Sequence, residues 1–249
     1  MNILQVIAAI ILMVFTSVTA NARESFTLKT PESALKVDVF TQNDKNARQA
    51  IVILSGSRGF NSAVYDDIGN KLAATGLDVY LAHLISPEDL HHLSAAKDAN
   101  SRIKYYRKRR ADWSREISAV VAHLNAMPRY AGRVGLLGIS LGAETAAITA
   151  SQGLTVAAVV LVDGSPPRDH AFSSKTLPPF HLIWGSADTV YPVSSGQRFM
   201  EQVKSAGGTA TMTIFQGAKH DFFLKSEATQ ANEAYKNAAE FLKSKLNSK

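Results

Sequence analysis

The pentapeptide Gly138-Ile139-Ser140-Leu141-Gly142 lies between the apolar run 134–137 and the helix-favouring segment 143–150. A serine that projects its hydroxyl from a sharp strand-to-helix turn adopts strained backbone angles, and side chains two positions before and after it would collide. Glycine at both of these positions removes the collision. The sequence therefore predicts that Ser140 is an exposed nucleophile at the tip of the turn; the alternative is a glycine-rich turn that only packs.

Short apolar runs alternate with longer amphipathic stretches on both sides of this pentapeptide, which is typical of βαβ units. Several runs are continuously apolar, so helices are expected on both faces of these strands. We predict an α/β fold with a mostly parallel, twisted sheet of about seven or eight strands, helices on both faces and no large lid domain. The predicted strands are 34–40, 50–54, 77–83, 133–139, 156–162, 180–184 and 209–215, and the predicted helices are 65–74, 112–125, 143–150, 194–206 and 230–246.

Two connections between these elements are long. Residues 85–110 are predicted to be the least regular insertion, and residues 164–179 a second long connection. No internal repeat or low-complexity linker divides the chain, so residues 23–249 are predicted to form a single domain.

Composition excludes several classes of protein. The chain has 249 residues, of which 46% are hydrophobic and 19% charged, and this excludes a disordered chain. The formal net charge of +6 is too small to predict nucleic-acid binding without a focused patch. Because the sequence has no Cys, it excludes a thiolate nucleophile and a disulfide framework.

The N-terminus carries a separate signal. Residues 3–15 are almost wholly apolar and are followed by small residues up to Ala20 and Ala22. This pattern predicts a secretory signal peptide over residues 1–22, cleaved after Ala20 or Ala22, and export to the periplasm or the medium. No Lys or Arg precedes the apolar run, so an uncleaved membrane anchor is the alternative, and only this alternative predicts a membrane partner.

A serine hydroxyl is a weak nucleophile unless an imidazole takes its proton and an acid orients that imidazole. Both groups must follow strands, because ligands gather at the carboxyl ends of the strands in such sheets. His220 follows the predicted strand 209–215, and Asp188 follows the predicted strand 180–184. The other six His residues fit this requirement less well. The sequence therefore predicts a catalytic triad of Ser140, His220 and Asp188.

Two other acids compete with Asp188. Asp163 also ends a predicted strand and is the rival acid. Asp221 fits less well, because a side chain adjacent to His220 along the backbone has difficulty reaching the far nitrogen of its ring. For Asp188 and Asp163 alike, the alternative is an ordinary helix cap or turn residue.

The tetrahedral intermediate of acyl transfer carries an oxyanion that backbone N–H groups must stabilise. The amide of Leu141, just after the nucleophile, is one candidate donor. A second is expected from the loop 55–59, Ser-Gly-Ser-Arg-Gly, where Ser57 is preferred over Arg58. A phosphate-binding loop is the alternative, but no Gly-Lys-Ser/Thr follows it.

One segment concentrates positive charge. We interpret it first as a solvated helical face; the alternatives are a patch that attracts a carboxylate or phosphate of the substrate, a membrane surface and nucleic acid. Three aromatic residues near the predicted triad are expected in the core, with an acyl pocket as the alternative. The basic residues are Arg102, Lys104, Arg107, Lys108, Arg109 and Arg110, interleaved with Tyr105 and Tyr106, and the three aromatic residues are Trp184, Phe222 and Phe223.

The loop 55–59, the turn around Ser140, Asp188 after a late strand and His220 before the last helix resemble the α/β-hydrolase superfamily in the chain order Ser, Asp, His. The resemblance covers residues 34–246. The Gly-Ser-Ala-Asp turn and the later Gly-Ala-Lys-His-Asp-Phe are most similar to the dienelactone hydrolase-like group. Enzymes that open dienelactones use a Cys nucleophile, so this chain resembles a serine variant and a different substrate is expected. Many relatives also carry His where this chain has Ser55.

The resemblance implies a serine hydrolase that cleaves a small soluble carboxylic ester through an acyl-enzyme intermediate, without a metal or organic cofactor. An anionic ester is one option for the substrate, because of the basic segment. Nucleic acid is not expected as a partner. The alternatives are a thioesterase, a peptidase-type acyl hydrolase and a non-catalytic ligand-binding member of the same fold, since one fold hosts many functions.

Overall fold

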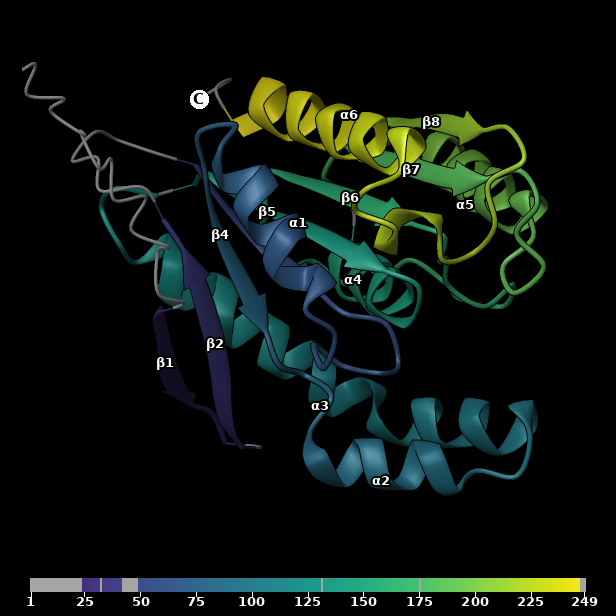
Figure 1. The fold of residues 1–249 in the computed structure, drawn as a ribbon, viewed down its shortest axis with the longest axis horizontal. Coiled ribbons are helices and arrows are strands. Elements are labelled where there is room, and N and C mark those ends of the chain that lie inside the picture. The colour runs from purple at the N-terminus through teal and green to yellow at the C-terminus, as the bar shows by residue number, and fades with distance from the viewer. Residues whose placement is uncertain (1–23, 32, 42–48, 131, 175, 247–249) are drawn as a thin grey trace, which may run out of the picture.

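Eight strands form one sheet in a computed structural model that describes residues 24–31, 33–41, 49–130, 132–174 and 176–246 (Figure 1). The predicted leader, residues 1–22, lies outside the described residues. The strand order is β1-β2-β4-β3-β5-β6-β7-β8; β1, β2 and β4 pair antiparallel, and all other neighbours pair parallel. The predicted mostly parallel sheet is thus confirmed. The strands are β1 Glu24–Lys29, β2 Ala34–Phe40, β3 Gln49–Leu54, β4 Leu77–Ala82, β5 Val134–Ile139, β6 Ala158–Val162, β7 Phe180–Gly185 and β8 Ala210–Phe215.

The seven predicted strands are confirmed within two residues at each end, and the eighth, β1, was not predicted. It is an edge strand in which only Phe26 and Leu28 are partly buried. Such a strand lacks the continuous apolar run that marks the central strands, because one of its faces meets water.

Side chains of the central strands alternate between two cores on opposite faces of the sheet. Ala50, Val52 and Leu54 of β3 belong to one core, and Ile51 and Ile53 belong to the other. Helices α3, α4 and α5 contribute to the first core, and helices α1 and α6 to the second (Figure 1). The predicted helices on both faces are therefore confirmed. Their bounds are α1 Val64–Ala73, α3 Ala99–Asn125, α4 Leu141–Ser151, α5 Val193–Ser205 and α6 Thr229–Leu246.

The insertion 85–110 is not irregular, and this prediction was wrong. It forms helix α2 (Pro87–Ala95) and the first part of α3, which lie side by side and extend away from the sheet (Figure 1). Ser86 caps α2 through a capping box with Asp89, and the Asp98 side chain caps α3. These caps start helices whose apolar periodicity is weak. We refer to α2 and residues 99–110 of α3 as the helical hairpin.

The connection 164–179 has no helix or strand among its described residues, as predicted. Trp184, Phe222 and Phe223 are buried in the two cores, so the prediction of core packing is confirmed for all three. Within the described part of the chain, no helix combines the length and the hydropathy that crossing a membrane requires.

Candidate active site

Ser140 stands at the end of β5 and immediately before α4, with φ 55° and ψ −115°. This left-handed conformation is rare for a residue with a side chain and is held only where the surrounding structure enforces it. A Cβ at Gly138 would lie 2.4 Å from the Gly142 carbonyl oxygen, and a Cβ at Gly142 would lie 2.3 Å from the Leu54 carbonyl oxygen. Glycine is therefore required at both positions, for the steric reason that the sequence suggested.

The structure brings Ser140, His220 and Asp188 together from three separate loops. Ser140 Oγ lies 2.9 Å from Nε2 of His220, and Nδ1 of His220 lies 2.8 Å from Oδ2 of Asp188. A carboxylate oxygen only accepts hydrogen bonds, so Nδ1 carries the proton and Nε2 is left to accept the serine hydroxyl. β5, β7 and β8 are parallel neighbours or near neighbours, so their carboxyl ends meet at one edge of the sheet.

The carboxylate of Asp188 is held on both of its oxygens. Oδ2 accepts from His220, and Oδ1 accepts from the backbone amides of Val190 and Tyr191 at 2.8 and 2.9 Å. The residue is buried, whereas the His220 side chain keeps 24% of its surface exposed. Asp188 is therefore a fixed anion beside an imidazole that a substrate can reach.

Neither rival acid contacts the imidazole in this way. Asp163 is fully buried and adopts φ 46°, and its Oδ1 accepts from the Gly185 amide at 2.8 Å. Its Oδ2 has no hydrogen-bond partner among the described residues. Burial raises the pKa of Asp163 to about 8, although the Gly185 amide opposes this shift. Asp221 is exposed, and its carboxylate lies 3.3 Å from the ammonium of Lys225.

One ligand atom from each of Asp163, Asp188 and His220 lies within 4.8 Å of the others, a separation that a metal ion could bridge. Two of these three groups, however, are hydrogen-bonded directly to each other at 2.8 Å. A cation ligated by both would have to replace that bond, so the arrangement fits a proton relay better than a metal site.

The loop 55–59 reaches Ser140. A Cβ built on Gly56 would lie 3.5 Å from Cβ and 4.0 Å from Oγ of Ser140. Leu141 is the first residue of α4, where an amide has no partner inside the helix. Ser57 and Arg58, the other two predicted donors, line the same cavity as Ser140 and Leu141. All three candidate donors therefore line the cavity that contains Ser140.

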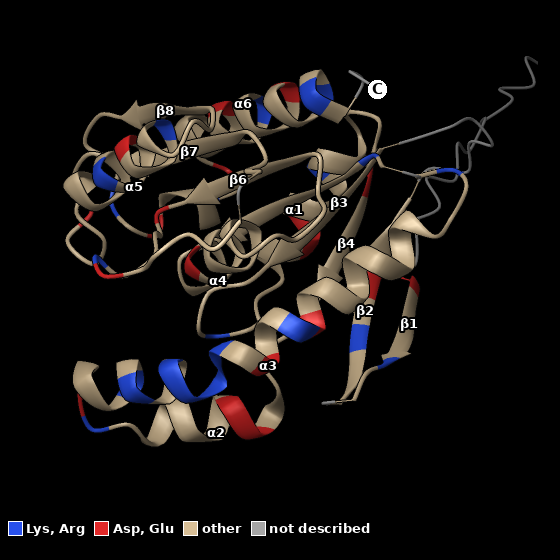
Figure 2. Cartoon of the chain, turned by 180° about the vertical axis from the view of Figure 1, so that it is seen from behind, with Lys and Arg blue, Asp and Glu red and all other residues tan. Residues whose placement is uncertain are grey.

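A cavity of about 1490 Å³ opens over this site. Its walls come from the loop 55–59, the hairpin, the start of α4 and the loops that carry Asp188 and His220. Two of its residues, Ile103 and Val190, are the large hydrophobic side chains that stay exposed in the described chain. The wall also carries several arginines, and Figure 2 shows that basic residues concentrate on the hairpin part of α3. The positively charged side chains lining the cavity are Arg58, Arg102, Arg107, Arg110 and Arg198.

The basic residues of this segment differ in their surroundings. Lys104 and Lys108 are exposed and do not line the cavity, as expected for a solvated face. Arg102 and Arg107 are exposed too, but they line the cavity. Arg109 serves the hairpin itself, because its Nε donates to the buried carboxylate of Asp89 at 2.8 Å.

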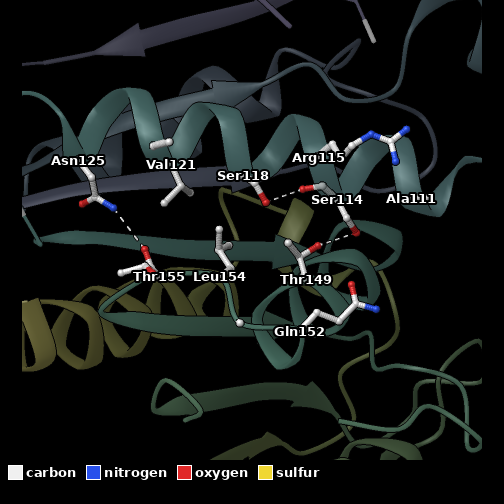
Figure 3. A pocket seen from close by; sticks show the side chains of 12 residues that line it. Ala111, Ser114, Arg115, Ser118, Val121, Asn125, Thr149, Gln152, Leu154 and Thr155 are labelled. Atoms are coloured by element: carbon white, nitrogen blue, oxygen red, sulfur yellow. Dashed lines mark hydrogen bonds between the residues drawn. The ribbon is translucent and has the colours of Figure 1, made fainter. Parts of the chain in front are cut away.

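A second cavity, of about 540 Å³, lies between α3 and the end of α4 (Figure 3). Its polar groups are largely satisfied within the wall: Thr149 Oγ1 donates to Ser114 Oγ at 2.9 Å, and Asn125 Nδ2 donates to the Thr155 carbonyl at 3.2 Å. The residues lining it include no His, Asp or Glu. It therefore offers no acid or base for chemistry.

The sequence did not single out two polar residues at the site, Glu144 and Tyr191. Glu144 lies one turn after the nucleophile in α4, and Tyr191 follows Asp188 by three positions; both line the cavity. The signal for Glu144 was present, since it is the one charged residue of an otherwise apolar or small helix. The signal for Tyr191 was not, because its contacts depend on the tertiary fold.

Three solved structures illustrate what this fold is similar to. A dienelactone hydrolase-like promiscuous phosphotriesterase from metagenomic libraries has a TM-score of 0.75 at 17% identity, covering 90% of this chain and 99% of that one. A dienelactone hydrolase from Anabaena variabilis has a TM-score of 0.69 at 20% identity, with coverages of 90% and 99%. Esterase 2 of Thermogutta terrifontis, phosphoramylated by tabun, has a TM-score of 0.68 at 20% identity, with coverages of 89% and 94%.

At these identities the structures show a shared fold. Among the curated proteins, none matches the chain in sequence. The family comparison goes further, because the model of the dienelactone hydrolase family matches residues 37–247, which include β3 to β8, the last four residues of β2 and all three residues of the predicted triad. The resemblance drawn from the sequence is thereby confirmed, and the chain belongs to the dienelactone hydrolase family.

Proposed function

We propose that this hydrolase is a serine esterase in which Ser140 is the nucleophile, His220 the general base and acid, and Asp188 the group that orients His220. One observation carries the proposal: Oγ, Nε2, Nδ1 and Oδ2 form a continuous chain with separations of 2.9 and 2.8 Å at its two hydrogen bonds. That chain lets a proton leave the hydroxyl as the oxygen attacks.

In the first half of the reaction, Ser140 Oγ forms a bond to the ester carbonyl carbon while its proton passes to Nε2 of His220. The resulting oxyanion accepts hydrogen bonds from the amide of Leu141 and from an amide of the loop 55–59, Ser57 or Arg58. The carbon–oxygen bond to the alcohol then breaks, and Nε2 returns the proton to the leaving oxygen. An acyl group remains on Ser140.

In the second half, His220 takes a proton from water as the water oxygen attacks the acyl carbon. The bond to Ser140 Oγ breaks, and Oγ recovers the proton from Nε2. Asp188 stabilises the imidazolium in both halves without itself becoming protonated. Every proton and electron pair is accounted for by the substrate, water and these three side chains.

The substrate that we propose is a small soluble carboxylic ester, with an anionic group as the distinguishing option. The cavity supports this choice, since Arg102 and Arg107 line it together with Ser140 and with apolar side chains. The esterases among the similar structures agree with an ester as the substrate, and the tabun adduct of one of them indicates a suitable reagent.

The test uses short-chain activated esters and a fluorophosphonate label. The wild-type protein should hydrolyse the esters and take up one label per chain, and Ser140→Ala should abolish both. Ser118→Ala is the matched control, because Ser118 lies on α3 beside the second cavity and should leave both signals intact. A folded wild-type protein that shows neither hydrolysis nor labelling would overturn the proposal in favour of a ligand-binding protein.

We also propose that the chain is exported and loses its leader after Ala20 or Ala22. The apolar run 3–15 and the small residues after it support this proposal. The N-terminal sequence of the protein recovered from its native cell tests it. A mature chain that still begins at Met1 and sediments with membranes would instead support the anchor.

A further inference from the structure

The aromatic ring of Tyr191 covers one face of the His220 imidazole. The two ring centroids lie 5.8 Å apart with an interplanar angle of 18°, an offset, nearly parallel arrangement. The hydrogen bonds of His220 to Ser140 and Asp188 lie in the plane of the imidazole and hold its two nitrogens. Contact with a face of the ring is the additional restraint that opposes tilting out of that plane.

Tyr191 is itself held at three points. Its amide donates to Oδ1 of Asp188 at 2.9 Å, and its carbonyl accepts from the indole N–H of the buried Trp184 at 2.8 Å. Its hydroxyl donates to Oε2 of Glu144 at 2.8 Å. The residue is therefore fixed to the triad acid, to the core and to helix α4 at the same time.

Glu144 links this tyrosine to the helical hairpin. Its Oε1 accepts from the guanidinium of Arg110 at 2.8 Å, while Oε2 holds Tyr191. The side chain of Glu144 keeps only 11% of its surface exposed and that of Arg110 keeps 27%, so this ion pair is partly shielded from water. Glu144 also follows Ser140 by one helical turn, with its amide donating to the Ser140 carbonyl at 3.0 Å.

We propose that Tyr191 is a positioning residue for His220, and that the Arg110–Glu144 pair of the hairpin and α4 holds Tyr191 in place. The proposal rests on the function proposed above, in which His220 moves the proton of Ser140. It assigns Tyr191, Glu144 and Arg110 no contact with the reacting atoms. They act through the orientation of the imidazole.

The physical argument concerns geometry at the moment of proton transfer. A small misplacement of a reacting group lowers a rate strongly, by about 100-fold for a shift of about 1 Å. His220 must keep Nε2 directed at Ser140 Oγ while the imidazole takes up the proton and becomes an imidazolium. A ring packed against one face, and anchored by its own hydroxyl, limits that motion.

Burial and the neighbouring carboxylate of Glu144 raise the pKa of Tyr191 above its usual range. The phenol therefore stays protonated at neutral pH, and it remains a hydrogen-bond donor to Glu144.

Kinetics of three variants test the chain of contacts. Tyr191→Leu removes the ring but keeps an apolar side chain in the cavity wall, and it should lower kcat by about 10- to 100-fold with a much smaller change in KM. Tyr191→Phe keeps the ring but loses the anchor, and its loss in kcat should be smaller. Glu144→Gln removes the charge that holds Arg110. The double variant with Tyr191→Phe should lose no more kcat than the more damaging of the two single variants, since both changes act on the same linkage.

Tyr105→Phe is the matched control. It also removes a tyrosine hydroxyl that donates to a buried carboxylate at 2.8 Å, here Oδ1 of Asp89, but within the hairpin and away from the cavity lining. Its kcat should stay within about twofold of wild type. An equal loss of kcat in Tyr105→Phe and Tyr191→Phe would contradict the proposal, because the loss would then not depend on the contact with His220.

A second readout does not require activity. The Nδ1 proton of His220, held by Asp188, should give a slowly exchanging low-field proton resonance in the wild-type protein. Tyr191→Leu should broaden or abolish this signal, and Tyr105→Phe should keep it. The signal would be expected even if Ser140 proved inert towards esters and organophosphorus labels, so failure of the proposed function is distinguishable from failure of this inference.

The inference is overturned if Tyr191→Leu retains the low-field resonance together with a kcat within about twofold of wild type. Should Tyr191→Leu fail to fold, Tyr191→Phe and Glu144→Gln still decide it. Fully additive losses in the double variant, or no loss in either single variant, would show that no linkage runs from Arg110 through Glu144 to the imidazole.

Discussion

Asp163 Oδ1 accepts a hydrogen bond from the Gly185 amide at 2.8 Å across the ends of β6 and β7, while the whole residue is shielded from solvent. The bond satisfies one oxygen of a carboxyl that water cannot reach. Burial is the larger effect and raises the pKa of this group from 3.8 to about 8. The carboxyl is therefore protonated at neutral pH.

This pKa predicts how stability changes with pH. Between pH 3.8 and about pH 8 the native state binds the proton of Asp163 while the unfolded state has lost it. The free energy of unfolding therefore falls as pH rises through this interval, and above it the contribution of this group no longer changes with pH. Asp163→Asn should remove that fall, so its advantage over wild type should grow from pH 5 to pH 9 in thermal or urea unfolding.

Asp221→Asn serves as the control for this measurement, because Asp221 is exposed and neighbours the same site. Its stability relative to wild type should not change in the same way over that pH range. A constant difference between Asp163→Asn and wild type from pH 5 to pH 9 would show that Asp163 is already ionised at neutral pH.

The strained backbone of Ser140 predicts a trade between stability and activity. Its φ of 55° and ψ of −115° suit glycine far better than any residue with a Cβ. Ser140→Gly should be more stable than Ser140→Ala by about 1 to 3 kcal/mol, the usual cost of such strain, and both should lack labelling. Equal unfolding free energies for the two variants would show that this turn stores no strain.

The glycine after the nucleophile should tolerate no side chain. A Cβ on Gly142 would lie 2.3 Å from the Leu54 carbonyl oxygen, so Gly142→Ala must displace β3 or α4 and should lower the free energy of unfolding by several kcal/mol. Gly56→Ala is the contrasting variant, since its nearest neighbour would lie at 3.5 Å. Urea unfolding of both proteins should rank them in that order.

The arginines of the hairpin predict a charge preference. An ester with a carboxylate in its acyl or alcohol part should have a higher kcat/KM than its neutral isostere, and this advantage should shrink at high salt. Arg102→Gln and Arg107→Gln should reduce it, whereas Lys104→Gln, which removes the same charge from the same helix outside the cavity, should not. Equal effects of all three changes would indicate only the overall field of the protein.

The hairpin should depend on one buried acid. Asp89 accepts from the Ser86 amide at 2.9 Å, from the Tyr105 hydroxyl at 2.8 Å and from Nε of Arg109 at 2.8 Å. Burial alone would raise its pKa, but these three hydrogen bonds together lower it. Asp89→Ala should therefore increase hydrogen exchange in α2 and in residues 99–110 of α3 while β5 and β6 stay protected. Uniformly faster exchange across the sheet would contradict this.

Much of this protein could be predicted from local sequence. Apolar and β-branched runs located seven strands, and the continuously apolar ones among them are strands covered on both faces. The two glycines around Ser140 predicted the sharp turn, because a side chain at either position would collide with nearby backbone atoms. The chain order of Ser140, Asp188 and His220 also pointed to the family, and the family comparison agrees.

The sequence was least informative about the helical hairpin, which extends away from the sheet. Helix α2 and the start of α3 lack a strong apolar stripe, so residues 85–110 had no periodic signal. Their order comes from caps at Ser86 and Asp98 and from the hydrogen bonds collected by Asp89. Polar contacts of this kind leave little trace in hydropathy.

The sequence by itself determined the alternation of strands and helices. It also determined that a serine stands at the end of a strand, because its flanking glycines allow the sharp turn there. Only the tertiary structure decided which acid faces His220, because Asp188 and Asp163 end neighbouring strands and differ in where their carboxylates point. It also decided that Glu144 meets Tyr191 across 47 positions of chain. Hydrophobic periodicity is local and survives in the sequence, whereas the direction of a polar side chain is set by partners that the fold brings from far away.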